Sequence, residues 1–239
     1  MKPIDLVAEL ERRLEALGLD GAPAAALATL LHALEPAEAP TSVHDPRAGL
    51  DVHIADSLSG FAVPELGSAA VVADLGAGGG LPGLVIAAVR PDARVVLVES
   101  VRRKGAFLRE TADAMNLGNV QVVTARAEEW AEGRGECDVV TARAVGSLPV
   151  LYEYAAPLLR EGGLLVAWKG HVTAAEAADG SAAAAILGLQ EAPALPVHPF
   201  AGSQRRTLWT ARKIGPTPVT YPRRPGIATK RPLSVKNLR

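Results

Sequence analysis

From residue 71 onward, short apolar runs alternate with stretches of helical periodicity, and this alternation constrains the fold more than any other feature of the chain. Apolar runs of four to eight residues are typical of strands buried on both faces of a sheet. The expected strands are residues 71–75, 94–99, 120–123, 137–141 and 163–168. The expected helices between them are residues 82–89, 102–115, 126–131 and 148–160. Strands joined by helices predict a parallel sheet with right-handed crossovers, which is an α/β fold.

The flanking segments have different patterns. Residues 4–17 place apolar side chains at helical spacing, and a second helix fits residues 24–34, so residues 1–70 are expected to form a helical cap. After the alternation, an Ala-rich helix at 173–187 and two last strands, within 193–200 and at 207–211, complete a core domain. This division predicts a cap over 1–70, a core domain over 71–213 and a tail over 214–239.

The composition is that of a globular protein. Of the 239 residues, 49% are hydrophobic and 21% are charged, which excludes a disordered or fibrous chain. The single cysteine, Cys137, excludes a disulfide framework and cysteine-clustered metal sites, and the five histidines are too scattered for metal-ligand spacing. No apolar run approaches the ~18 residues of a spanning helix, and the N-terminus lacks the order of a signal peptide. We therefore expect a cytoplasmic monomer that binds no metal and no membrane.

Charge is distributed unevenly along the chain. Glu191 is the last acidic residue, so all 26 acidic residues precede position 192, whereas 10 of the 25 basic residues follow it. The tail contains the run Tyr221-Pro222-Arg223-Arg224-Pro225 and, further on, Lys230 and Arg231. A basic, proline-rich segment favours a polyanionic partner. The alternatives are a solvated tail and a tail that packs its arginines against the acidic body.

The loop after the first expected strand reads Asp74-Leu75-Gly76-Ala77-Gly78-Gly79-Gly80-Leu81-Pro82-Gly83. Its glycines let the backbone approach a ligand closely, and the positive end of the following helix faces the same place. The dinucleotide fingerprint requires a third glycine where this chain has Leu81, which disfavours a nicotinamide dinucleotide. The alternative is a loop that is glycine-rich only for tight packing.

Two acids near this loop indicate which ligand it binds. Asp74 lies two residues before Gly76, where a carboxylate repels a pyrophosphate but suits a cationic ligand. Glu99 ends the second strand, at the place where an acid can accept hydrogen bonds from both hydroxyls of a ribose. Glu99 alone is shared with dinucleotide enzymes. Together the two acids point to S-adenosylmethionine, whose sulfonium is cationic.

These residues carry a resemblance to a known family. The chain resembles the bacterial 16S ribosomal RNA guanine-N7 methyltransferases, the glucose-inhibited division protein B family, over about residues 41–170. The matching segments are Thr41-Ser42-Val43-His44-Asp45-Pro46, His53-Ile54-Ala55-Asp56-Ser57-Leu58, the 74–83 loop, Lys104-Gly105-Ala106-Phe107-Leu108-Arg109, Ala127-Glu128-Glu129, Thr141-Ala142-Arg143-Ala144 and Trp168-Lys169-Gly170. Residues 221–233 are similar to the C-terminal signature of many members.

The resemblance implies a class I S-adenosylmethionine-dependent methyltransferase fold, that is, a Rossmann-like sheet with helices on both faces and an N-terminal helical cap. It implies methylation of one guanine in the 530 loop of 16S ribosomal RNA, either naked or in a partly assembled small subunit. By that likeness Gly76 and Leu81 line the methionine and ribose end of the cofactor, Ala127 and Glu128 the adenine, and Arg143 the far wall of the cofactor pocket. Gly78, in the same glycine loop, is a further expected cofactor contact. No catalytic base is expected, because guanine N7 carries an unprotonated lone pair at neutral pH.

Further cations are candidates for RNA contact. Arg102, Arg103 and Lys104 start a helix, where the dipole disfavours cations, so an external phosphate is the expected partner. Lys169 ends the fifth strand and suits an RNA phosphate or solvent. Arg143 ends the fourth strand and suits a guanine or the cofactor, with an ion pair to a nearby carboxylate as the alternative.

Two departures from the family pattern concern the cap. Leu34-Glu35-Pro36-Ala37-Glu38-Ala39-Pro40 replaces the aromatic and asparagine-rich segment that members usually carry before Thr41, and His44 replaces the usual arginine. Both affect the expected RNA-facing surface rather than the cofactor site. His53 and Asp56, three residues apart, are expected to form a buried hydrogen-bonded pair.

Three other functional classes compete with RNA methylation. A NAD-dependent oxidoreductase is disfavoured by Asp74 and Leu81, and a noncatalytic RNA-binding module by the complete cofactor loop. A methyltransferase acting on a small molecule or a protein is the nearest alternative, and the basic tail argues against it.

Overall fold

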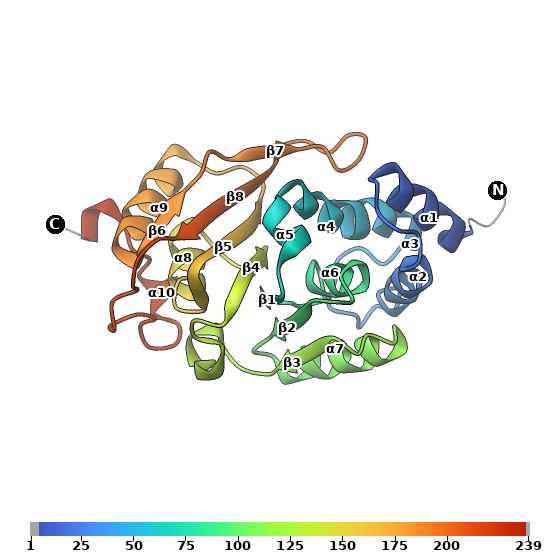
Figure 1. Cartoon of the computed structure of the whole chain (residues 1–239), viewed down its shortest axis with the longest axis horizontal. Coiled ribbons are helices and arrows are strands. Elements are labelled where there is room, and N and C mark those ends of the chain that lie inside the picture. Colours follow the sequence, from blue (N-terminus) through green and yellow to red (C-terminus); the bar gives the residue numbers. More distant parts are fainter. Residues whose placement is uncertain (1–4, 238–239) are drawn as a thin grey trace.

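The computed structural model describes residues 5–237 and contains one mixed sheet with helices on both faces (Figure 1). The strand order is β3-β2-β1-β4-β5-β8-β6, and β7 pairs with β8. The strands are β1 (Val71–Leu75), β2 (Arg94–Val98), β3 (Val120–Val123), β4 (Cys137–Arg143), β5 (Leu159–Lys169), β6 (Leu189–Glu191), β7 (Leu195–Val197) and β8 (Arg206–Lys213). Neighbours from β3 to β5 run parallel, as expected, whereas β8 is antiparallel to β5, β6 and β7.

The helices follow the expected alternation in the core domain except over residues 126–131, where two short 3₁₀ turns take the place of the expected helix. The α-helices are α1 (Leu6–Ala16), α2 (Ala24–Ala33), α3 (Pro46–Gly49), α4 (Asp56–Leu58), α5 (Pro64–Ser68), α6 (Gly83–Val89), α7 (Arg102–Ala114), α8 (Leu148–Ala155), α9 (Ala174–Leu187) and α10 (Ile227–Lys230). Residues 50–55 form a π-helical turn between α3 and α4, and short 3₁₀ turns occupy 59–62, 127–129, 131–133 and 235–237. Ile4, which the periodicity includes in the first helix, lies outside the described residues.

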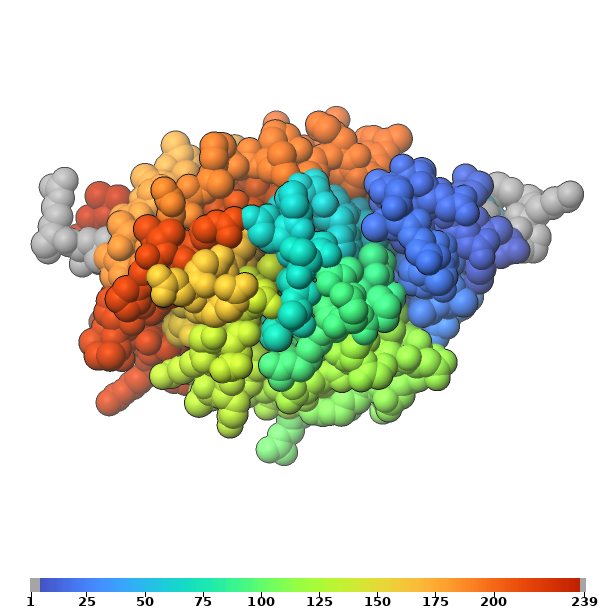
Figure 2. Space-filling view, in the orientation of Figure 1, coloured from blue at the N-terminus to red at the C-terminus, as the bar shows by residue number. Residues whose placement is uncertain are grey.

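Alternate strand residues face two separate cores, which is the period of two that a strand imposes. Val72 and Val95 join α1, α2 and α6 in one core, so the N-terminal helices share that core with the sheet. Ala73 and Val96 point the other way and join α8, α9 and the tail. Figure 2 shows the N-terminal helices and the C-terminal segment at opposite ends of the molecule. The cap and the tail therefore complete the two cores of the sheet.

Prolines explain where the expected boundaries were wrong. The helix expected over 148–160 ends at Ala155, because Pro157 cannot donate the amide that would continue it, and β5 starts at Leu159. The strand expected within 193–200 contains prolines at 193, 196 and 199, and only Leu195–Val197 pair with β8. The sequence also missed β6, a three-residue strand beside β8.

The basic tail is docked on α8 through a buried ion pair. Glu153 on α8 is fully buried, and its Oε2 accepts a 2.6 Å hydrogen bond from Arg223 Nη2. Arg223 also donates its backbone N–H and Nε to Glu153 Oε1, each at 2.9 Å. Ala228 and Leu233 are buried in the same core as α8. The Glu153 carboxylate raises the pKa of Arg223, as expected for a stabilised cation.

We expect Arg223→Ala to lower the free energy of unfolding by about 3 kcal/mol, because it leaves the Glu153 carboxylate buried without its cation. Arg224→Ala is the matched control, since the neighbouring side chain is exposed, and it should change stability by less than about 0.5 kcal/mol. Urea unfolding of both variants measures the difference. Equal stability of the two variants would show that the ion pair does not hold the tail.

Candidate active site

The carboxyl ends of the central parallel strands meet at one edge of the sheet. Leu75 of β1 lies in register with Val98 of β2 and with Ala142 of β4. The residues that follow these positions are therefore brought together: Gly76 after β1, Glu99 after β2 and Arg143 at the end of β4. In parallel α/β sheets this edge is where ligands bind.

The glycine loop takes backbone conformations that other residues rarely adopt. Gly76 has φ of +65° and Gly78 has φ of +54°. A Cβ atom on Gly76 would lie 2.8 Å from the Val145 side chain, which follows β4. The Gly76 N–H donates to the Val98 carbonyl at 2.8 Å. Glycine is thus required at position 76 both by its backbone conformation and by the close approach of Val145.

Asp74 is enclosed beneath this loop. Its Oδ2 accepts a 3.0 Å hydrogen bond from the Gly83 N–H at the start of α6, and its Oδ1 accepts one of 2.9 Å from Thr141 Oγ1 on β4. The side chain has no exposed surface, and burial raises its pKa to about 7. From the sequence, the Asp74 carboxylate was expected to lie near the cationic sulfonium. In the structure both of its oxygens instead accept hydrogen bonds from protein groups. Asp74 therefore positions β1, α6 and β4 relative to one another.

Glu99 holds the other side of the loop. Its Oε2 accepts a 3.0 Å hydrogen bond from the Gly78 N–H, and its Oε1 accepts one of 2.8 Å from the Val101 N–H. The residue is 5% exposed. A carboxylate oxygen has two lone pairs, so each oxygen can accept a further hydrogen bond from a ligand.

The residues expected around the adenine lie beside the tail. Ala127 and Glu128 belong to the 3₁₀ turn after β3. Glu128 is 9% exposed, and its Oε1 accepts a 2.9 Å hydrogen bond from the Gly226 N–H. Leu81, expected at the methionine end, is 7% exposed. Sequence reasoning missed Gly226, because the contact joins residues 98 positions apart.

Arg143 forms an ion pair with the cap through one of its guanidinium nitrogens. Its Nη1 donates to Asp56 Oδ2 at 2.9 Å and to the Val52 carbonyl at 3.1 Å. The Asp56 side chain is 4% exposed. This is the alternative that the sequence left open for Arg143, and it corrects the expected His53–Asp56 pair. His53 instead uses Nε2 to bind the Val43 carbonyl at 2.9 Å, and burial lowers its pKa.

A cavity of about 310 Å³ lies beside this ion pair, at the ends of β4 and β5. Arg143, Trp168 and Lys169 line it together with Arg206, whose Nε is 3.5 Å from Asp56 Oδ1. Sequence reasoning did not single out Arg206. Its position on β8 becomes adjacent only when that strand pairs with β5.

The cations expected to bind RNA separate into two groups. Lys169 and Arg223 are ion-paired within the protein: Lys169 Nζ lies 2.7 Å from Glu176 Oε1 and donates to the Gly146 carbonyl, and Arg223 binds Glu153. For Arg223 this is the packing against the acidic body that the sequence left as an alternative. The other six have no ion pair with any of residues 5–237 and remain candidates. They are Arg102, Arg103, Lys104, Arg224, Lys230 and Arg231.

Residues 5–237 contain no group of three or more His, Cys, Asp or Glu side chains placed to hold a metal ion. None of their helices combines the length and apolar character needed to cross a membrane. Cys137 is fully buried in the core, where burial raises the pKa of its thiol to about 12.

Comparison with known proteins connects this geometry to a family. The family described as rRNA small subunit methyltransferase G matches residues 23–204. A Ribosomal RNA small subunit methyltransferase G of Rubrobacter xylanophilus is 43% identical over 197 residues, which cover 79% of this chain and 75% of that protein. One from Deinococcus deserti is 40% identical and covers 91% of this chain and 92% of that protein.

Solved structures agree on the fold. A SAM dependent methyltransferase from Aquifex aeolicus superposes with a TM-score of 0.53 at 14% identity, covering 70% of this chain and 96% of that one. The expected class I methyltransferase architecture is thereby confirmed, and so is the family resemblance of the sequence motifs. The chain belongs to the rRNA small subunit methyltransferase G family, a family of ribosomal RNA methyltransferases.

Proposed function

We propose that this protein transfers a methyl group from S-adenosylmethionine to N7 of one guanine in the 530 loop of 16S ribosomal RNA. The observation that carries the proposal is the pairing of Glu99 with the Gly78 N–H at 3.0 Å, at the sheet edge where the family motifs converge. The substrate is naked RNA or a partly assembled small subunit. The reaction takes place in the cytoplasm, where that RNA is found.

The site fits the proposed methyl donor. Each Glu99 oxygen accepts one backbone hydrogen bond and can accept a second, one from each of the two ribose hydroxyls. Gly76 and Gly78 expose backbone rather than side chains, and Leu81 gives the methionine end an apolar contact. Ala127 and Glu128 are assigned to the adenine. When bound, S-adenosylmethionine supplies an electrophilic methyl group on a cationic sulfonium.

Asp74 acts through the loop in this proposal. Its hydrogen bonds to Gly83 and Thr141 fix the start of α6 and the end of β4 on either side of Gly76. Asp74 is thus a positioning residue.

The chemistry requires alignment rather than a base. Guanine N7 has a free lone pair at neutral pH, so displacement at the methyl carbon needs no proton transfer before it. Arg143 and Arg206 line the cavity at the ends of β4 and β5 and can orient the base by hydrogen bonds to its acceptor atoms. The protein contributes by holding the base in line with the methyl group and by stabilising the charge that develops during the transfer. No catalytic residue is assigned.

The experiment that tests the function is mass-spectrometric mapping of 16S ribosomal RNA after incubation with the protein and S-adenosylmethionine. The experiment is done once with naked 16S ribosomal RNA and once with small subunits that lack the modification. We expect one 7-methylguanine, in the 530 loop, and none when either the protein or the donor is omitted. Methylation at another atom or another loop, or of neither substrate, contradicts the proposal.

The raised pKa of Asp74 makes the contribution of this residue to folding depend on pH. Because the folded carboxyl has a pKa of about 7 against an ordinary value of 3.8, the folded state binds its proton more tightly than the unfolded state does. Its contribution to folding therefore becomes less favourable as the pH rises from about 4 to about 7. Asp74→Asn does not titrate, and its amide can still accept from Gly83 and donate to Thr141.

We expect the stability of Asp74→Asn relative to the wild type to increase between pH 4 and pH 7 and to stay constant above that range. Urea unfolding at several pH values measures this difference. Asp113→Asn, which changes an exposed carboxyl on α7, is the control and should follow the wild-type profile. The same pH profile for both variants would show that Asp74 is not held with a raised pKa.

A further inference from the structure

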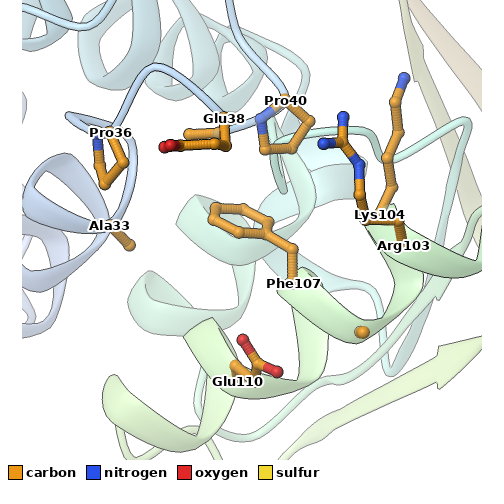
Figure 3. Close-up of a pocket in the computed structure, with 10 residues that line it drawn as sticks. Ala33, Pro36, Glu38, Pro40, Arg103, Lys104, Phe107 and Glu110 are labelled. Atoms are coloured by element: carbon orange, nitrogen blue, oxygen red, sulfur yellow. The ribbon is translucent and has the colours of Figure 1, made fainter.

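A second cavity lies between the cap and α7, apart from the cavity at β4 and β5. It has a volume of about 280 Å³ and is formed by the end of α2, the loop after it and the part of α7 from Arg103 to Glu110 (Figure 3). Phe107 occupies its centre, and Ala33, Pro36 and Pro40 supply further apolar surface. Figure 3 shows Arg103 and Lys104 on one side of the Phe107 ring and Ala33 and Pro36 on the other.

The apolar part of this cavity is suited to a flat ring. Phe107 is partly buried and packs against the core beneath it, so its ring is held in place. Prolines 36 and 40 are rigid and carry no amide hydrogen, so the facing loop adds apolar surface without a donor that would need a partner. Unstacked nucleobases bind to proteins by stacking on aromatic rings in such settings.

The charged groups around the ring are unpaired. Among residues 5–237, none forms an ion pair with Arg103 or Lys104, although Glu38 and Glu110 line the same cavity. The cations are suited to a phosphate, and the carboxylates can accept hydrogen bonds from the amino groups of a base. A nucleotide carries a phosphate and a base with amino groups, and one sugar separates them. A protein segment could match this cavity only with an acidic residue next to an exposed ring or amide.

One wall of the cavity, at Pro40, packs against the glycine loop. A Cβ atom on Gly79 would lie 3.1 Å from the Pro40 carbonyl oxygen and 3.2 Å from the Leu34 side chain. The other wall, α7, begins three residues after Glu99. A ligand in this cavity would therefore contact elements that adjoin the proposed methyl-donor site on both sides.

We propose that this cavity binds one unpaired nucleotide of the ribosomal RNA, with its base stacked on Phe107 and its phosphate bound by Arg103 and Lys104. The inference rests on the proposed function, because it takes RNA as the substrate. The nucleotide is distinct from the methylated guanine, which belongs at the ends of β4 and β5. Its binding anchors the RNA strand beside the glycine loop.

The test compares RNA binding by the S-adenosylhomocysteine-loaded wild type with two variants. Phe107→Leu keeps apolar volume against the core but removes the ring, and it should weaken binding of 16S ribosomal RNA by about tenfold. Arg103→Gln combined with Lys104→Gln should reduce the dependence of log affinity on log salt by about 0.7 for each lost phosphate contact. Cofactor affinity, measured by titration, should stay within twofold of the wild type in both.

Arg134→Gln is the matched control, because it removes an exposed, unpaired arginine before β4, at the other end of the strands. It should leave RNA affinity and salt dependence unchanged. Ultraviolet cross-linking gives a direct readout: trypsin releases the segment 105–109, which should carry a nucleotide in the wild type and none in Phe107→Leu.

The outcomes separate the inference from the proposed function. If the wild type methylates 16S ribosomal RNA but Phe107→Leu binds it equally well and segment 105–109 carries no nucleotide, the inference is wrong and the function stands. If segment 105–109 instead cross-links to a ribosomal protein in assembled subunits, the cavity binds protein, which also overturns the inference. If the wild type neither binds nor methylates the RNA, both fail.

Discussion

Two buried carboxylates hold the glycine loop, and the site depends on them. Asp74 binds the N–H of Gly83 from below, and Glu99 binds the N–H of Gly78 from the side. Each carboxylate comes from the end of a different parallel strand, so the sheet itself sets the distance between them. A loop rich in glycine would otherwise sample many conformations, since its residues have no side chains to restrict them. The hydrogen bonds from Gly83 to Asp74 and from Gly78 to Glu99 restrict the loop to one backbone conformation.

The cap and the tail are attached to the same edge of the sheet. The cap reaches it through Pro40, which lies against Gly79, and through Asp56, which binds Arg143. The tail reaches it through Gly226, which donates to Glu128 after β3. Segments at opposite ends of the sequence thus both contact residues that follow the carboxyl ends of the parallel strands. Because the same segments also complete the two cores, loss of either one would disturb both stability and the site.

The sequence predicted the parts of the structure that depend on local pattern. Strand and helix order followed from periodicity, and the glycine loop and Glu99 followed from their places after strands. It did not predict the long-range partners of charged side chains. Ion pairs of Arg223 and Arg143 were alternatives from the sequence, but their partners were not identified, because Glu153 is 70 residues from Arg223 and Asp56 is 87 residues from Arg143. Asp74 reads as a ligand contact for the same reason: Thr141 reaches it only through pairing of β1 with β4.

The most direct test of the central claim is calorimetric titration of Glu99→Gln with S-adenosylmethionine. Glutamine has one acceptor oxygen, so its NH₂ group would face the N–H of either Gly78 or Val101. The ribose hydroxyls would also lose a charged acceptor. Charged hydrogen bonds contribute roughly 1.5–3 kcal/mol against ~1 for neutral ones, so the account predicts an affinity about tenfold weaker than that of the wild type. Glu129→Gln, on the exposed side of the turn after β3, should bind as the wild type does. An affinity for Glu99→Gln within twofold of that control would contradict the account.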